Sequence, residues 1–475
     1  MAETFERKLD ARLVLSVAAA GIMSFSGVVV ETSMNIAFPS LMEEFGVSTA
    51  TVQWITTGYL LVLAIIMPLS AFLKRRFKTK SLFVTALLLF FTGTVVCAAA
   101  PSFGFLIAGR IVQGLGTGIA LPLMYNIVIE QAPFDKMGTM MGIATLITAV
   151  APAVGPSLGG LILSVAGWRM IFIVLLPLLV ASFFMGVYAI RQASPTEKAS
   201  FSVLQFVTLA ASFACLVFAT SSASTEGWAS AQVWGLIAAF VVLLVLFYFE
   251  ARNSKNPLIH VDIFSNPCFT LSVVYIVLFQ SIVLSLGYLI PNYAQMSCDF
   301  GEFASGCLLL PGCIVGAILA PFGGRILDAF GAKRPIIFGA LAQLLAMILF
   351  AAVGLKGAAM VLAVIYILIA VGQGFSMPNS ITNGLSYLPE SRKTDGNATF
   401  NTLQQLGGAM GTSIATSIVN AAQTGAADMA VATAAGVQQA FYVFAGVSAL
   451  SVICCMLVFV IAARRRNPDS VVRPR

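Results

Sequence analysis

The run FGFLIAGRIVQGLGTGIALPLMYNIV, residues 103–128, decides the class of fold to which this chain belongs. It is long enough to cross a lipid bilayer as a helix, because a span needs about 20 mostly apolar residues at 1.5 Å of rise each. Its only charged residue is Arg110. The run therefore predicts a membrane-spanning helix with one deeply placed arginine.

The rest of the chain has the same character. Of its 475 residues, 59% are apolar and 9% are charged, and the mean hydropathy is +0.96. A soluble domain carries about 25% charged residues, so soluble enzymes and nucleic-acid-binding modules are excluded. We interpret the net charge of +7 as a signal of loop orientation. A single histidine, His260, and eight cysteines without a CxxC pair predict neither a metal site nor a cofactor.

Fourteen apolar segments follow one another, separated by charged or Gly-, Pro- and Asn-rich breaks. They lie at 13–36, 49–73, 81–100, 103–128, 137–163, 168–190, 202–221, 231–250, 268–293, 303–321, 335–353, 358–380, 397–421 and 438–463. We expect an all-α polytopic membrane protein with a six-helix bundle in 1–190 and another in 268–463. Residues 191–267 then hold an inserted helix pair, spans seven and eight, with linkers, and 464–475 form a basic tail.

The basic residues occupy alternate connections between these spans. Both termini and every second loop are rich in Lys and Arg, as at 74–80, 333–334 and 464–466, whereas the opposite loops hold only Arg169 and Lys356. Cytoplasmic loops carry such an excess of Lys and Arg. The sequence therefore predicts a multi-pass protein of the cell (plasma or inner) membrane with both termini in the cytoplasm.

Two of the cytoplasmic turns are alike: PLSAFLKRRFKTK at 68–80 and PFGGRILDAFGAKR at 321–334. A sequence motif that is repeated in the two halves of a chain is typical of pseudo-symmetric transporters. The second turn resembles the loop motif of the major facilitator superfamily, with Gly324 and Asp328 in its Gly and Asp positions. The first turn departs from that motif, because Ala71 replaces Gly and Arg75 replaces Asp.

Three more stretches resemble the fourteen-span drug:proton antiporter (multidrug efflux) branch of that superfamily. Residues 106–122 are similar to its fourth-helix motif, 151–160 to the antiporter motif of helix five, and 31–39 to its first-helix motif, which normally begins with Asp. The resemblance covers essentially the whole chain and implies the major facilitator fold. It also implies gating loops and a tightly packed seam, for which the candidates are Asp328, Gly324, Arg76, Pro152, Gly155, Pro156 and Gly159.

Glu31 is the one acidic residue well inside a span. A charged carboxylate in hydrocarbon is costly, so Glu31 must take up a proton or find a partner. It lies about 9 Å below the outer end of its helix, and Arg110 about 10 Å below that of another helix in the same half. We expect the two to communicate across a central cavity, directly or through water. The sequence leaves three roles open for Glu31. It exchanges a proton for a cationic substrate, it only holds the bundle together by pairing with Arg110, or its side chain extends to the outer surface.

Polar and aromatic residues within the spans are candidates for the cavity wall, since amides that face lipid are left without partners. They are Asn35, Tyr59, Gln113, Tyr125, Gln280, Tyr288, Asn401 and Gln404. We expect an apolar cavity with one acid, which suits lipophilic cations.

The sequence thus predicts proton-coupled efflux of lipophilic, mainly cationic drugs or dyes by alternating access. The expected partners are small lipophilic cations, protons and the bilayer, without nucleic acid, and the chain is expected to act as a monomer. One alternative is a proton-coupled exporter or flippase of one physiological amphiphile, a lipid or a siderophore. Another is a polytopic membrane enzyme, although no His, Cys/His or paired-acid constellation lies near either surface.

Overall fold

The computed structural model describes residues 9–133, 137–193, 195–196, 201–254, 257–353, 359–389 and 392–466, and within them the chain forms helices and no strand. The elements are α1 (Ala11–Met34), α2 (Phe38–Phe45), α3 (Thr49–Val52), α4 (Trp54–Ile66), η1 (Met67–Leu69), α5 (Ser70–Arg76), α6 (Thr79–Ala98), α7 (Phe103–Gln131), α8 (Met137–Ala166), α9 (Arg169–Ile173), α10 (Leu175–Ala189), α11 (Val203–Glu226), α12 (Ala231–Asn253), η2 (Val261–Ser265), α13 (Pro267–Ser297), α14 (Glu302–Cys307), α15 (Leu310–Phe330), α16 (Lys333–Val353), α17 (Ala359–Ser386), α18 (Lys393–Gln423) and α19 (Met429–Arg466).

Twelve helical segments in the described residues are long and apolar enough to cross a membrane, so this is a multi-pass membrane protein. Their ends fall close to the breaks in the apolar pattern, because a helix in lipid must satisfy its backbone hydrogen bonds internally. Two further helices, α8 and α18, have 30 and 31 residues. They are not among the twelve: α8 runs through residues whose side chains are not described, and α18 is rich in Asn, Gln and Thr.

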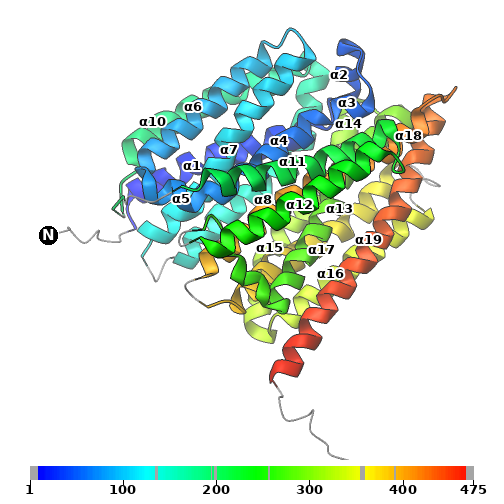
Figure 1. The fold of residues 1–475 in the computed structure, drawn as a ribbon. Coiled ribbons are helices and arrows are strands. Elements are labelled where there is room, and N and C mark those ends of the chain that lie inside the picture. The colour runs from blue at the N-terminus through cyan, green and yellow to red at the C-terminus, as the bar shows by residue number, and fades with distance from the viewer. Residues whose placement is uncertain are drawn as a thin grey trace, which may run out of the picture.

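The helices before α11 and those after α12 pack mainly among themselves, and we call them the N-terminal and C-terminal halves (Figure 1). In the N-terminal half α1 packs against α7, α8 and α10. In the C-terminal half α13 packs against α17, α18 and α19. The halves meet mainly where α18 contacts α4 and where α8 contacts α14 and α15, with smaller contacts of α18 with α3, η1 and α5 and of α13 with α2. Any relative motion of the halves must therefore change these contacts.

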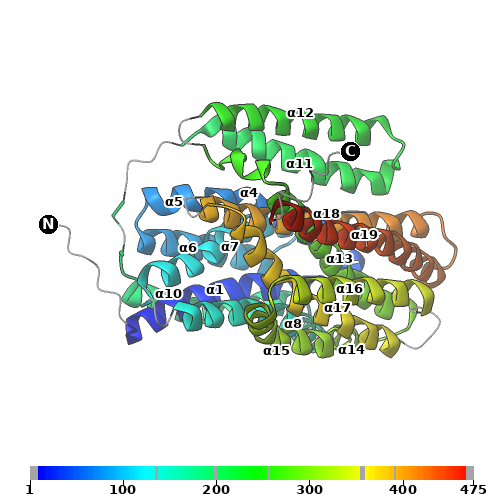
Figure 2. The same ribbon diagram turned by 90° about the horizontal axis from the view of Figure 1, so that it is seen from below.

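The helices α11 and α12 form a pair at one edge of the molecule (Figure 2). The pair is held through α11, which contacts α18 and α4. The Trp54 and Phe218 rings lie 4.7 Å apart, and Gln53 Nε2 donates a hydrogen bond to Ser221 Oγ at 2.8 Å. The outer helix α12 buries few of its residues, which suits a surface that faces lipid.

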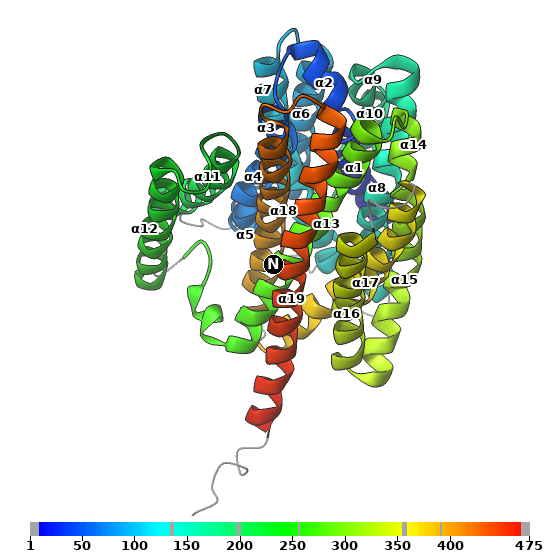
Figure 3. The same cartoon turned by 90° about the vertical axis from the view of Figure 1, so that its right-hand side faces the viewer.

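The two halves are joined at the end of the molecule opposite to the start of α1. Thr49 Oγ1 donates to Gln423 Oε1 at 2.7 Å, and Gln295 Nε2 donates to the Ile36 carbonyl at 3.1 Å. Beside them α8 packs closely on α14. Figure 3 shows α2, α3 and the end of α18 together at this end, away from the long extension of α19. We call this set of contacts the distal seam.

Candidate functional site

A cavity of about 330 Å³ lies between the two halves, on the side of the distal seam that faces the chain termini. Its walls come from α1, α7 and α8 on one side and from α13, α15, α17 and α18 on the other. The residues that line it are Val28, Glu31, Thr32, Met67, Leu121, Pro122, Tyr125, Pro152, Gln280, Leu284, Cys313, Gly316, Ala317, Ala370, Gln373, Gly374, Met377, Pro378, Ile381, Asn401, Gln404 and Gln405.

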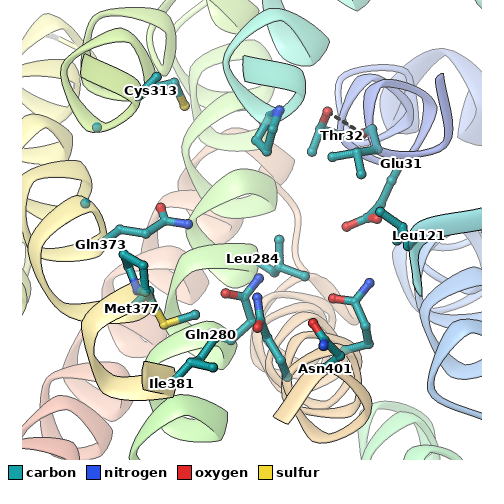
Figure 4. Close-up of a pocket in the computed structure, with 18 of the residues that line it drawn as sticks. Glu31, Thr32, Leu121, Gln280, Leu284, Cys313, Gln373, Met377, Ile381 and Asn401 are labelled. Atoms are coloured by element: carbon teal, nitrogen blue, oxygen red, sulfur yellow. Dashed lines mark hydrogen bonds between the residues drawn. The ribbon is translucent and has the colours of Figure 1, made fainter. Parts of the chain in front are cut away.

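Glu31 is the one acidic residue of this lining. It lies in the last turn of α1, and its side chain is 5% exposed. Figure 4 shows the carboxylate directed into the space between the halves. Among the described residues no hydrogen bond or ion pair reaches it. A buried carboxylate without a protein partner is open to a proton or to a cation that enters the cavity.

Arg110 does not form an ion pair with Glu31. It is buried within the N-terminal half, where Nε donates to the Ile55 carbonyl at 3.1 Å and Nη1 donates to Gln113 Oε1 at 3.0 Å. Its guanidinium carbon lies 4.0 Å from the centre of the Tyr59 ring, a cation–π arrangement. The arginine is thus held behind the cavity wall.

Tyr59 and Gln113 connect Arg110 to neighbouring helices rather than to the cavity. The Tyr59 hydroxyl lies 2.8 Å from Thr117 Oγ1 and 3.1 Å from the Gly27 carbonyl, to which it donates. Gln113 Nε2 donates to Thr94 Oγ1 at 2.8 Å. Because Gly27 lies one turn before Glu31 on α1, this network joins the arginine to the helix that carries the acid.

The other cavity candidates divide into two groups. Tyr125, Gln280, Asn401 and Gln404 line the cavity. Asn35 and Tyr288 lie near the distal seam instead: Asn35 Oδ1 accepts a hydrogen bond from Thr56 Oγ1 at 2.8 Å, and the Tyr288 ring is 5.6 Å from that of Phe38. Gln373 also lines the cavity, although it was not among the candidates predicted from the sequence.

Helix α8 packs against α1 of its own half and against α14 of the other half. Ser33 Oγ donates to the Gly155 carbonyl at 2.6 Å, and Gly159 faces the same part of α1. A Cβ added at Gly160 would overlap the backbone of Glu302 in the C-terminal half. The Pro156 carbonyl lies against α14, and Pro152 lines the cavity. One face of α8 therefore packs within its own half, and another face packs across the two.

The gating-loop candidates are described only in part. The surroundings of Gly324 and the side chain of Asp328 lie outside what the structure describes. Arg76 is exposed at the end of α5. Its neighbour Arg75, which stands where the family loop has Asp, is close enough to Asp395 of the C-terminal half to interact with it electrostatically. Arg75, whose charge is opposite to that of the Asp in the family loop, thus lies near the acidic residue Asp395 of the other half.

Asp395 lies beside the linker that follows α12. His260 Nε2 is 3.9 Å from Asp395 Oδ2, and Arg392 Nε is 3.2 Å from Asp262 Oδ2. In the part of the chain that the structure describes, no group of three His, Cys, Asp or Glu residues is placed to hold a metal ion. The two pairs connect the linker after α12 to the start of α18.

Comparison with known families and proteins gives concordant results. The family model described as Major Facilitator Superfamily matches residues 18–412. The lincomycin resistance protein LmrB of Bacillus subtilis is 38% identical over 441 residues, which cover 90% of this chain and 92% of that protein. The protein of the same name in Listeria monocytogenes is 34% identical and covers 91% and 94%. A putative multidrug resistance protein MdtD of Cronobacter sakazakii is 28% identical and covers 81% of each chain.

Solved structures share the fold at low sequence identity. A bacterial homologue of the human lysosomal transporter Spinster has a TM-score of 0.70 at 13% identity and covers 95% of this chain and 98% of that one. The POT family transporter PepTSo has a TM-score of 0.68 at 17% identity, and the match covers 98% of this chain and 99% of that one. These likenesses concern the arrangement of the helices alone.

Proposed function

This chain belongs to the major facilitator superfamily, and on that premise we propose that it exports lipophilic, mainly cationic drugs in exchange for protons by alternating access. The family consists of transporters, so the chain is a transporter and not an enzyme. The relatives named for resistance to lincomycin and to multiple drugs support a drug as the substrate. Proton coupling and the cationic charge are parts of the proposal.

The proposal includes the topology. We infer fourteen spans, in which α8 and α18 add to the twelve apolar helices, with α11 and α12 as the pair inserted between two six-helix bundles. The bundles comprise 1–190 and 268–463, and the basic tail 464–475 follows the last span. Both termini face the cytoplasm of a cell whose membrane holds the protein as a monomer. In this orientation the cavity faces inward, because the distal seam lies on the outer side.

One observation carries the mechanism: the cavity lining contains a single carboxylate, and that carboxylate has no protein partner among the described residues. A cationic drug that enters from the cytoplasm displaces the proton of Glu31. After the halves have rocked, a proton from outside returns to Glu31 and removes the charge that held the drug. Each pH unit across the membrane supplies about 1.4 kcal/mol to this exchange.

Two other groups of residues support this step. Ile55 and Tyr59 hold Arg110 in place, so its positive charge stays near α1 without forming an ion pair with Glu31. The close packing of α8 at Gly155, Gly159 and Pro156 acts as the pivot and as a seal against proton leakage. The gating role falls to Asp328 and Gly324 in the second loop and to Arg76 in the first.

The test uses proteoliposomes that contain the purified full chain and ethidium as the transported cation. With an imposed pH gradient, the native protein should accumulate ethidium, and Glu31→Gln should reduce this uptake to the level of empty vesicles. Glu43→Gln is the matched control, because Glu43 is an exposed acid on α2. If Glu31→Gln keeps its pH-driven uptake, Glu31 is not the coupling residue.

A further inference from the structure

The C-terminal half presents a polar wall to the cavity, and Gln280, Asn401 and Gln404 of this wall are among the candidates predicted from the sequence. Gln280 of α13, Gln373 of α17 and Asn401, Gln404 and Gln405 of α18 line it. Figure 4 shows Gln280, Gln373 and Asn401 around the same space that the Glu31 carboxylate enters. We call these five residues the carboxamide wall.

Most of the carboxamide wall has no hydrogen-bond partner within the protein. Asn401 Nδ2 donates to the Asn397 carbonyl at 2.9 Å. Among the described residues, the side chains of Gln280, Gln373, Gln404 and Gln405 have no such partner. Gln280 is the sharpest case, because its side chain is 7% exposed and its Oε1 is fully buried.

Most buried amides away from the cavity behave differently. Several of them donate to a defined acceptor, as Gln53 does to Ser221, Gln113 to Thr94, Gln343 to the Phe279 carbonyl, Asn379 to the Gly323 carbonyl and Gln423 to Thr433. Asn292 is an exception, because neither of its side-chain polar atoms has a partner among the described residues. Buried polar groups in proteins nearly always find such partners. Among the described residues, Gln280, Gln373, Gln404 and Gln405 are unpartnered amides that line one cavity, so a molecule in the cavity can take up their hydrogen bonds.

The two walls offer complementary chemistry. A carboxamide both donates and accepts hydrogen bonds, so the C-terminal wall can bind hydroxyl and amide groups but adds no charge. Glu31, on the opposite wall, supplies the charge. We propose that the carboxamide wall selects, among cationic drugs, those that carry several hydroxyl or amide groups over those that carry none. This inference rests on the proposed function and adds the substrate class to it.

The experiment compares two cations in proteoliposomes of the full chain under a pH gradient. Lincomycin is an amine that carries hydroxyl and amide groups, and tetraphenylphosphonium is a cation without any hydrogen-bonding group. The double variant Gln280→Leu/Gln404→Leu removes two amides and keeps similar bulk. We expect its KM for lincomycin to rise about tenfold, since each lost hydrogen bond contributes modestly, while its KM for tetraphenylphosphonium stays within about twofold of the native value.

Three controls keep the result specific. Retained transport of tetraphenylphosphonium shows that the variant folds. Met377→Leu alters the same cavity without removing an amide and should leave the ratio of the two KM values unchanged. The conservative variant Gln404→Asn should restore most of the lincomycin transport that Gln404→Leu loses.

The outcomes separate this inference from the function on which it rests. If the double variant changes both KM values equally, the inference that the carboxamide wall selects among cations is wrong. Native transport of tetraphenylphosphonium without transport of lincomycin would also overturn it and would leave proton-coupled export intact. Failure of the native protein to transport either cation under a pH gradient would overturn the proposed function itself.

Discussion

At the scale of single residues, the protein keeps its two intramembrane charges apart. Arg110 interacts with the Ile55 carbonyl, Gln113 and the Tyr59 ring, so it does not neutralise Glu31 by a direct ion pair. A direct pair would be strong in a buried site and would compete with any cationic substrate. The arrangement leaves Glu31 available while a positive charge stays in the same half.

The geometry around Arg110 leads to a prediction. Arg110→Lys keeps the charge but loses the planar fork that reaches Ile55 and Gln113 at once. We expect pH-driven ethidium uptake to fall by about tenfold or more, which corresponds to about 1.4 kcal/mol. Uptake in proteoliposomes measures it, with the exposed Arg252→Lys as control. Uptake at the native level in Arg110→Lys would show that only the charge matters.

The sequence singled out Glu31 and Arg110 as candidates because each is a lone charge in an apolar run. It did not predict the partners of Arg110, since Ile55 and Tyr59 reach it only through the packing of α4 on α7. Which residues line the cavity depends on how each helix is rotated about its axis, because consecutive residues on a helix point in directions about 100° apart. For that reason Gln404 faces the cavity whereas Gln113 does not.

At the scale of the helices, the spacing of apolar segments predicted most helix ends to within about six residues, but α15 ends nine residues later and α19 begins nine residues earlier than predicted. The predicted segment 397–421 lies within α18, although the polar residues of α18 make it a weak membrane span by composition. Its polarity is explained by its neighbours, because α18 packs against α4, α11, α13 and α19 and contributes Asn401, Gln404 and Gln405 to the cavity. Hydropathy alone does not distinguish such a helix from a loop.

The short helix α2 is tied to α9 by Glu44. Arg169 Nη2 lies 2.7 Å from Glu44 Oε1, and Trp168 Nε1 donates to Glu44 Oε2 at 2.6 Å. The Arg169 guanidinium, assisted by the Trp168 N–H, holds the pKa of Glu44 below its ordinary value of 4.5. A lowered pKa in the folded state means that the interaction stabilises the protein above pH 4.5 and that this contribution is lost as the pH falls further.

We therefore predict a pH-dependent effect of Glu44→Gln. Its thermal midpoint in detergent should lie slightly below that of the native protein at pH 7, and the difference should shrink at pH 4. The loss should stay below about 1 kcal/mol, because the side chains are partly exposed to solvent. A difference that grows on acidification would contradict this account, and Glu43→Gln should show no difference at either pH.

At the scale of the whole molecule, the distal seam must open if the two halves rock as proposed. Its cross-half hydrogen bonds, from Thr49 to Gln423 and from Gln295 to the Ile36 carbonyl, each contribute about 0.5–1.5 kcal/mol. One pH unit supplies about 1.4 kcal/mol per proton. Breaking these two hydrogen bonds would therefore take a free energy of the same order as one proton supplies in the proposed exchange.

The central claim is that Glu31 exchanges a proton for a cationic drug, and proton release on drug binding tests it most directly. Purified protein in weakly buffered detergent at neutral pH is mixed with ethidium, and bound dye and released protons are counted together. The account predicts up to about one proton released per bound dye for the native chain and none for Glu31→Gln. Release that persists undiminished in Glu31→Gln would contradict the account.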